Sequence, residues 1–357
     1  MPSSLIVRCV PIKNVRTHPN ADNLVIIDIM GWQVCTHKDT KPEVDELRVF
    51  IPPDAVLPQE LAEQLEVTKY LRKGNRVGQK QFRGEMSFGI AATNTWGFAK
   101  GEEVSEKLGI TKYIPPITPH SGDQERDHPY FLNYPHIENW RNYPEVFTQD
   151  DFVFMHEKVH GTNSKVGIVP EDEEGDNFGL DIFVIGSHNT RKKFVDPEDE
   201  NYRKKVSLYQ YPLNIVSPLL MAVQEAKEAR VVIIYGEIFG RVQDLKYGRN
   251  NELAYRAFDI YVDGKFLDWE EVEKWCVEYK VDTPPLVYAG PFSEAAMKSS
   301  ANQNTLLMPP DTAHMSEGVI IRPQKESKHP EIGRKILKFK SDAYEERFAR
   351  GKGTEFA

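Results

Sequence analysis

The chain is poor in cysteine and has no long hydrophobic run. Its three cysteines in 357 residues, Cys9, Cys35 and Cys276, lie too far apart for a disulfide framework or a paired metal site. This usage fits a reducing compartment, so we expect a cytoplasmic protein. The first residues, MPSSLIVRCVPIKNV, lack the apolar core of a signal peptide, and no stretch is long enough to cross a bilayer. We therefore expect no membrane partner.

The chain also lacks an overall positive charge. A net charge of −9 argues against a general nucleic-acid coat protein, but it leaves room for local basic tracks. The clearest track, KYLRKGNRVGQKQFR from Lys69 to Arg83, has six basic residues and no acid. Two shorter tracks are 191–193 and 334–340. Taken alone, each track is better explained as a solvated face of the protein.

The length suggests two domains. Residues 1–115 contain short runs rich in valine, isoleucine and leucine, punctuated by proline, glycine and asparagine, with one short helix expected over 58–66. This pattern predicts a small closed β-barrel rather than a βαβ unit. Residues 116–135 are rich in proline, aspartate and histidine, and we expect them to form an exposed linker.

Residues 136–357 have a different pattern, which predicts an α+β domain of strands flanked by helices. Strands are expected at 151–158, 164–170, 180–187, 230–240, 254–264, 317–323 and 334–340. Helices are expected at 213–229, where Pro218 should split the helix, and at 268–280, where apolar residues recur at helical spacing.

A lone lysine, Lys158 in EKVHGTN, lies between two of these strands. The ordinary explanation is a hairpin whose lysine points into solvent. Four other elements, however, also place polar or charged residues at the end of an apolar strand; they are Gly186–Arg191, Glu237, Glu317 and Leu337–Lys340. Together they supply an amine, two carboxylates and further cations. This set suits phosphoryl-group transfer, which depends on positioning the phosphate and neutralising its charge.

Lys338 and Lys340 are spaced two residues apart, so on a strand both face the same side. An ordinary lysine is protonated at neutral pH and cannot attack a phosphate. Two nearby cations and a metal ion would lower the pKa of Lys158. The alternative for the pair is an amphipathic strand with one wet face.

The five ordered motifs resemble those of the covalent nucleotidyltransferases, which include polynucleotide ligases and mRNA capping enzymes. DNA ligases and capping enzymes usually have an aspartate where His160 stands, and EKVHGTN looks like the branch of ATP-dependent RNA ligases that contains phage nick-sealing and trypanosome editing enzymes. The resemblance covers Ile137 to Lys340 and implies an ATP-grasp-like ligase fold of antiparallel sheets. HPNADNL, Gly31-Trp32 and RGEMSFG look like the N-terminal OB domain of the RNA ligase group with Deinococcus and Naegleria members.

The resemblance implies a role for each motif. Lys158 is the nucleophile that takes AMP from ATP, and Lys338 and Lys340 contact the phosphates. Glu237 and Glu317 help to hold Mg²⁺ or Mn²⁺, with Glu237 also near the ribose; the alternative for both is an ion pair with an arginine such as Arg241 or Arg322. Further nucleotide contacts are implied for five residues, namely Glu157 at the base edge, Gly161, Asn163, Arg191 and a stacking Phe258, although an aromatic ring in such a strand is more often part of the core.

In the motif GSHNTR, the family usually has an arginine or lysine where His188 stands. It therefore stays open which of His188, Asn189 and Arg191 contacts phosphate; we assign the first two to RNA. In the N-terminal domain, Arg72, Lys73 and Arg83 are expected to bind RNA, because OB folds combine basic grooves with stacking aromatics. The alternative is that the barrel only supports the second domain.

These expectations describe an ATP-dependent RNA ligase acting in RNA repair. It would join 3′-hydroxyl and 5′-phosphate RNA ends, most plausibly at nicks in a duplex or across a template strand, through a lysyl-AMP intermediate and an RNA-adenylate. We expect a monomer. Two alternatives are a GTP-dependent capping guanylyltransferase and a non-catalytic RNA-binding protein. An aspartate in place of His160 would have favoured the first, and loss of the catalytic lysines and carboxylates would have favoured the second.

Overall fold

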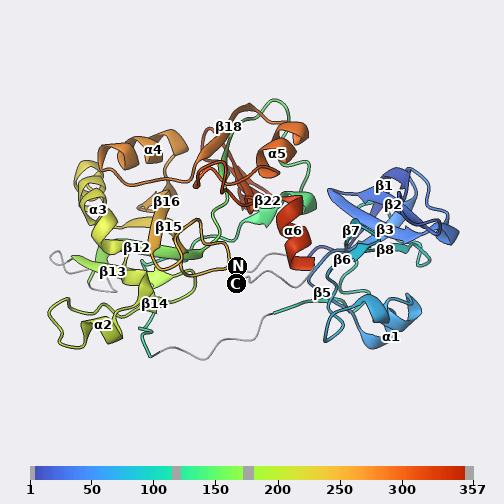
Figure 1. Ribbon diagram of the computed structural model, residues 1–357, viewed down its shortest axis with the longest axis horizontal. Helices are drawn as coiled ribbons and strands as arrows, with labels where there is room; N and C mark the ends of the chain where they lie inside the picture. The colour runs from blue at the N-terminus through green and yellow to red at the C-terminus, as the bar shows by residue number, and fades with distance from the viewer. Residues whose placement is uncertain (1–4, 115–121, 172–180, 350–357) are drawn as a thin grey trace.

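The computed structural model describes residues 5–114, 122–171 and 181–349 (Figure 1). Its first part is a curled five-stranded antiparallel sheet with the strand order β3-β2-β1-β4-β8. The strands are β1 (Arg8–Thr17), β2 (Leu24–Ile29), β3 (Trp32–His37), β4 (Leu47–Ile51) and β8 (Ile90–Thr93). The smaller elements are η1 (Lys38–Thr40), β5 (Ala55–Val56), α1 (Gln59–Gln64), η2 (Thr68–Tyr70) and β9 (Thr111–Lys112), of which β5 and β9 pair with each other.

The hairpin of β6 (Gln79–Phe82) and β7 (Glu85–Phe88) nearly closes this sheet into a barrel. Its strand β7 lies against β3, where the Cys35 amide donates to Ser87 Oγ at 3.0 Å and Gln33 Nε2 donates to the Met86 carbonyl at 2.8 Å. The predicted barrel-type N-terminal part is therefore confirmed.

The second part contains two larger sheets. A six-stranded sheet has the order β14-β13-β12-β15-β16-β17, from β12 (Thr162–Pro170), β13 (Asp181–Ser187), β14 (Arg191–Lys192), β15 (Val232–Gly240), β16 (Leu253–Val262) and β17 (Lys265–Phe266). A five-stranded sheet has the order β10-β22-β19-β11-β18, from β10 (Glu138–Asn139), β11 (Phe152–Glu157), β18 (Leu286–Pro291), β19 (Gly318–Pro323) and β22 (Leu337–Lys340). All pairs in both sheets are antiparallel except β10 with β22. The α+β class is confirmed.

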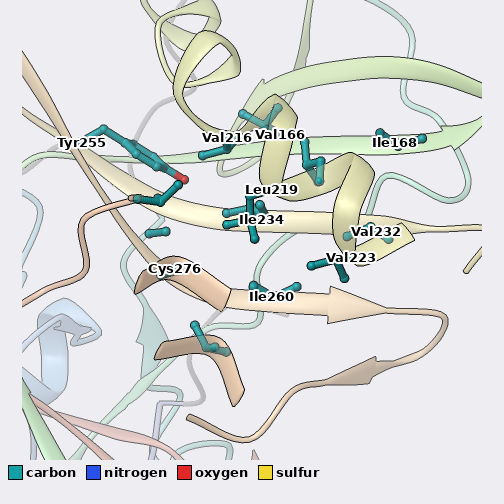
Figure 2. Close-up of a cluster of buried hydrophobic side chains, with 14 of the residues drawn as sticks. Val166, Ile168, Val216, Leu219, Val223, Val232, Ile234, Tyr255, Ile260 and Cys276 are labelled. Atoms are coloured by element: carbon teal, nitrogen blue, oxygen red, sulfur yellow. The ribbon is translucent and has the colours of Figure 1, made fainter. Parts of the chain in front are cut away.

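Helices cover the outer faces of both sheets. The six-stranded sheet is covered by α3 (Leu213–Lys227) and α4 (Trp269–Glu278), and Figure 2 shows Val216, Leu219 and Val223 of α3 packed over Val166 and Ile234. The remaining helical elements are η3 (Trp140–Asn142), α2 (Tyr202–Lys205), η4 (Leu208–Gln210), α5 (Glu294–Ala301) and α6 (Asp342–Ala349), and β20 (Lys328–His329) pairs with β21 (Gly333–Arg334). In the part of the chain that the structure describes, no helix is long and apolar enough to cross a membrane.

The prediction that Pro218 splits the first long helix is wrong. Helix α3 is 15 residues long and continues through Pro218 without a break. A proline in a helix leaves the carbonyl four residues earlier without its usual partner. Here that residue is Asn214, and both Asn214 and Pro218 are exposed. Solvent can therefore reach the freed carbonyl, while the buried face of α3 keeps its packing.

The five-stranded sheet also has an apolar outer face. Val153 and Met155 of β11, Val319 and Ile321 of β19, and Phe339 of β22 are fully buried in one cluster with residues of α5 and η3. Because side chains alternate along a strand, the residues between them point to the opposite, inner face. That face meets the six-stranded sheet, as the ion pair of Arg322 with Asp259 at 3.1 Å shows.

The two parts of the chain contact each other directly. Trp32 Nε1 donates to Asn142 Oδ1 at 2.9 Å, and Gln79 Nε2 donates to Glu345 Oε2 at 2.8 Å. Glu345 belongs to α6, which lies between the barrel and the two larger sheets (Figure 1). The division into 1–115, 116–135 and 136–357 stays a prediction, and residues 115–121 at the start of the expected linker lie outside the described ranges.

Candidate active site

Lys158 lies at the crossing from one sheet to the other. Strand β11 before it belongs to the five-stranded sheet, and β12 after it belongs to the six-stranded sheet, so the two strands do not form a hairpin. The simple hairpin explanation of Lys158 is therefore wrong. Gly161 makes the crossing possible, since a Cβ there would lie 2.1 Å from the Ile238 carbonyl oxygen of β15. The side chain of Lys158 is 25% exposed and reaches Glu317 Oε1 at 2.8 Å.

Lys158, Glu237 and Glu317 form one centre, in which each side chain influences the pKa of the others. The pKa shifts there favour the charged forms of Lys158 and Glu317. Burial acts to lower the pKa of Lys158, but Glu317 and Glu237 outweigh it and hold that pKa above its ordinary value, while Lys340 acts in the lowering direction. Burial opposes the charge of Glu317 too, yet Lys158, His160 and Lys340 lower its pKa to about 2. The cations alone therefore do not make Lys158 a free amine.

The pKa of Glu237 is shifted in the direction opposite to that of Glu317. Burial, together with the charge of Glu317, raises the pKa of Glu237 to about 8, although Lys158 and His160 act against this. Among the described residues no group of three or more histidine, cysteine, aspartate or glutamate side chains forms a full metal cage. Glu237 and Glu317 are two neighbouring carboxylates whose negative charge is opposed by burial. Such a pair fits Mg²⁺ or Mn²⁺ bound mainly through water, since these ions commonly keep several waters.

His160 is buried behind this centre. Its Nδ1 lies 3.3 Å from Glu317 Oε2, and its Nε2 lies 2.7 Å from Asp244 Oδ1. The hydroxyl of Tyr344, on α6, lies 3.1 Å from the same Nδ1. No local pattern marks Asp244 or Tyr344, because they follow Lys158 by many residues and lie on a turn and a helix of ordinary composition.

The two lysines of β22 share the inner face, as their spacing predicts. Leu337 and Phe339 are fully buried on the outer face, whereas Lys338 and Lys340 are partly exposed. Lys340 pairs in register with Gly318, next to Glu317. A Cβ at Gly318 would lie 2.1 Å from the Phe339 carbonyl oxygen, so glycine permits this close pairing. The structure thus brings Lys340 to the Lys158 centre.

A second group of basic side chains surrounds Lys338. Burial lowers the pKa of His136 to about 3, and Lys338, Lys112 and His188 act in the same direction. Burial likewise lowers the pKa of Lys165 to about 8, and its Nζ donates to the Phe131 carbonyl at 3.3 Å. Sequence reasoning missed His136 and Lys165. A usable signal for Lys165 was its position two residues after Asn163, which places both on one face of β12.

The residues expected around the nucleotide differ in the partners that they have. Both oxygens of Glu157 accept hydrogen bonds, from Thr305 Oγ1 at 2.5 Å and from the Leu306 amide at 2.8 Å. Asn163 pairs in register with Glu237, and its buried Oδ1 has no partner among the described residues. Phe258 is partly exposed and packs edge-to-face against Tyr134, with the ring centres 5.0 Å apart. The unsatisfied Asn163 oxygen is therefore available to a ligand.

The motif GSHNTR occupies the end of β13 and the start of β14. His188 is half-buried near Lys165 and Lys338, both of which, after burial, lower its pKa; its neighbour Asn189, at 2.7 Å from its Nδ1, raises it. Asn189 is exposed. Arg191 pairs with Glu125 of the expected linker at 3.1 Å. Of the three residues, His188 is therefore the one that lies in the basic group around Lys338.

The predicted RNA-binding residues of the barrel are not part of this centre. Lys73 and Arg83 are exposed, and Arg72 donates to Gln79 at 2.9 Å. Nearby, Tyr70 is 40% exposed and packs edge-to-face on Phe82, with 5.5 Å between ring centres. Because Gln79 also contacts α6, this basic surface borders the second part of the chain.

Comparison with known proteins agrees with these motifs. The family model for RNA ligases matches residues 151–340, more than half of the chain. No curated protein sequence matches the chain. Among solved structures, Naegleria gruberi RNA ligase variants with AMP and manganese and with ATP and manganese superpose with a TM-score of 0.70 at 16% and 17% identity, over 96% of this chain and 98% of theirs. The same enzyme with pyrophosphate also gives 0.70 at 16%, over 97% and 99%. The chain belongs to the RNA ligase family.

Proposed function

We propose that this protein is an ATP-dependent RNA ligase that joins 3′-hydroxyl and 5′-phosphate ends through a covalent lysyl-AMP on Lys158. One observation carries the proposal. Lys158 stands at the crossing between the two sheets with Glu317 at 2.8 Å and with Glu237 and Lys340 close enough to shift its pKa. RNA-ligase family membership and the likeness to an enzyme solved with ATP and manganese support it.

The reaction has three steps. Lys158 Nζ attacks the α-phosphorus of ATP, pyrophosphate leaves, and a phosphoramidate forms. AMP then passes to a 5′-phosphate end of RNA, which frees the lysine. The neighbouring 3′-hydroxyl displaces AMP and closes the phosphodiester. In the first step Lys158 must lose a proton that Glu317 and Glu237 help to retain.

Glu237 and Glu317 are the residues that would hold a divalent cation. The chemistry that a bound Mg²⁺ or Mn²⁺ supplies is positive charge, which neutralises the two carboxylates, lowers the pKa of Lys158 and draws charge from phosphate oxygens. Lys338 and Lys340 neutralise the phosphates from β22, and His136, Lys165 and His188 extend this positive surface. Because these cationic side chains are already in position when the reaction begins, they stabilise the negative charge that develops on the leaving pyrophosphate.

The nucleoside would lie between the two sheets. Phe258 would stack on adenine, and Asn163 would offer its unsatisfied Oδ1 to the ribose or a phosphate-bound water. Glu157, held by Thr305 and Leu306, would present its remaining lone pairs to the adenine amino group. Gly161 keeps the turn close to β15 so that these groups converge. Arg191 would reach the nucleotide only after leaving Glu125.

The RNA substrate we propose is a nick in a duplex or a junction on a template strand. Pairing to a second strand holds both ends together and removes much of the entropic barrier to joining them. Arg72, Lys73 and Arg83 on the barrel, with His188 and Asn189 on the second part, would contact the RNA backbone. We also propose that the enzyme acts as a monomer in the cytoplasm, where its three free cysteines would stay reduced.

The first experiment is incubation with α-³²P-ATP and Mg²⁺ or Mn²⁺, followed by a denaturing gel. We expect label on the wild-type chain and none on Lys158→Ala. A second arm supplies a nicked RNA duplex and follows sealing. Label from GTP alone would assign the capping reaction instead, and absence of label from either nucleotide would reject the proposal.

A further inference from the structure

A turn that the proposed reaction does not use holds the Lys158 crossing from behind. This turn, Gln243–Tyr247, follows β15 and makes three contacts with the segment 158–161. Gln243 Nε2 donates to the Gly161 carbonyl at 3.0 Å, and the His160 amide donates to the Tyr247 hydroxyl at 2.7 Å. The third contact is the pair of Asp244 Oδ1 and His160 Nε2 at 2.7 Å.

Asp244 is the outer end of a line of four groups that leads to the nucleophile. His160 Nδ1 lies 3.3 Å from Glu317 Oε2, and the other oxygen of Glu317 lies 2.8 Å from Lys158 Nζ. The side chains of His160 and Glu317 are only 5% and 2% exposed. Because the imidazole bridges two carboxylates in a buried site, it cannot rotate without breaking both contacts. The orientation of Glu317 therefore depends on Asp244 through His160.

Helix α6 fixes Asp244 in turn. Arg347 on α6 places its Nε and Nη2 at 2.9 Å and 2.6 Å from Asp244 Oδ2. The helix begins at Asp342, two residues after Lys340, so the segment that carries the phosphate-binding lysine returns to the back of the same site. A charge-assisted, two-donor contact of this kind is among the stronger hydrogen-bonding arrangements in proteins.

We propose that Asp244 and Arg347 are positioning residues for the adenylylation of Lys158: they fix the His160 ring, which holds the Glu317 carboxylate against the lysine. The proposal rests on the function proposed above. Both residues act on Lys158 through His160 and Glu317. This parallels other sites in which a carboxylate behind a histidine sets the orientation of the ring, and loss of such a partner commonly costs about 10- to 100-fold in activity.

The first test compares single-turnover formation of the Lys158–AMP adduct in Asp244→Ala, Asp244→Asn and Arg347→Met with the wild type. We expect the rate constant of Asp244→Ala to fall by about 10- to 100-fold, while the KM for ATP changes by less than about threefold. Asp244→Asn retains one acceptor oxygen and should recover part of the rate. Asp268→Asn, an aspartate that pairs with Lys325 beside α4, is the matched control and should react like the wild type.

The second test needs neither ATP nor metal. Acetic anhydride labelling with mass-spectrometric detection measures how readily Lys158 is acylated relative to the exposed Lys274. A loosened Glu317 should make Lys158 in Asp244→Ala about two- to tenfold more reactive than in the wild type. If the wild type forms no adduct with ATP, the proposed function fails, yet this labelling still tests the positioning.

Two results would overturn the positioning role. One is wild-type rates and wild-type labelling in Asp244→Ala. The other is a loss of rate that matches a loss of folded protein, seen by circular dichroism, with Lys158 labelling unchanged and no recovery in Asp244→Asn. The second pattern would mean that Asp244 and Arg347 only anchor α6.

Discussion

Lys165 is a buried residue of the site, and burial disfavours the positive charge of its side chain. Its side chain is 2% exposed on the inner face of β12, and burial lowers its pKa to about 8 from an ordinary value of 10.5. The Phe131 carbonyl, the Phe131 ring at 4.4 Å and the charge of Asp127 offset part of the lost hydration. A cation kept under these conditions costs stability, and it is useful where an anion such as phosphate will arrive.

Lys165 therefore gives a pH dependence of known sign. Below pH 8 the folded and unfolded chains both carry the proton, so the cost of burying the charge is fully present. Between pH 8 and 10.5 only the unfolded chain keeps the proton, and stability rises with pH. We expect the wild type to gain up to about 3 kcal/mol relative to Lys165→Met over this range. Urea unfolding of both proteins from pH 7 to 10.5 measures the difference.

The exposed Lys274 on α4 supplies the control for that series. Lys274→Met, at an exposed position on α4, removes a lysine of the same length from outside the site and should unfold in parallel with the wild type. A constant difference between the wild type and Lys165→Met across the same pH range would show that Lys165 is not a buried cation in the folded protein.

At the scale of elements, the basic segment Lys69–Arg83 of the barrel is the best candidate for a separate RNA contact. Lys73 and Arg83 are exposed near Tyr70 and Phe82, which supply rings for stacking. We expect Lys73→Ala/Arg83→Ala to bind a nicked RNA duplex more weakly and to lower the slope of log K against log salt by about 2, one for each lost phosphate contact. Adenylylation of Lys158 by ATP should be unchanged.

Fluorescence anisotropy at several salt concentrations gives the slope. The matched control is Lys13→Ala/Lys38→Ala, which removes two exposed lysines from other parts of the same barrel. If both double variants lose the same affinity, the basic segment contributes to RNA binding only through the net charge of the barrel. If neither changes the slope, RNA does not touch this surface.

Local pattern predicted most elements and failed where distant parts of the chain decide. The strand before Lys158 could be predicted from its apolar run at 152–155, and the strand of Lys338 from alternating apolar residues, which also put Lys338 and Lys340 on one side. The hairpin explanation of Lys158 failed because β11 and β12 pair with strands of two different sheets instead of with each other. No local sequence signal encodes such distant strand partners. Asp244 was missed for a similar reason, since its partners His160 and Arg347 come from segments far along the chain.

At the scale of the whole molecule, the barrel and the catalytic part share a buried junction. Ile6, before the first barrel strand, packs in the core of the five-stranded sheet with Trp140 and Phe339. Trp32 of the barrel bonds to Asn142. A truncation of the barrel would expose this core, so loss of activity in a truncated chain would not distinguish RNA binding from structural support. Point substitutions at the junction are the better experiment.

Arg141 is the residue on which such a test should centre. Its guanidinium is buried and lies over the rings of Trp32 at 5.5 Å and Phe339 at 4.4 Å, and it donates to the Gly31 carbonyl at 3.2 Å and to Asp342 at 3.3 Å. It thus joins the barrel, strand β22 at Phe339, and the start of α6.

Arg141→Lys keeps the charge but loses the planar group that stacks on both sides and bonds in two directions. We expect a loss of about 2–4 kcal/mol in unfolding free energy and a separate, earlier unfolding transition of the barrel. Formation of lysyl-AMP should slow as well, because Phe339 lies between Lys338 and Lys340. Calorimetry and ATP labelling measure the two effects. Arg230→Lys, at an exposed arginine whose guanidinium lies 6.0 Å from the centre of the Tyr130 ring, should change stability by less than about 0.5 kcal/mol. If Arg141→Lys unfolds and labels like the wild type, the barrel does not influence Lys338 and Lys340 through this junction.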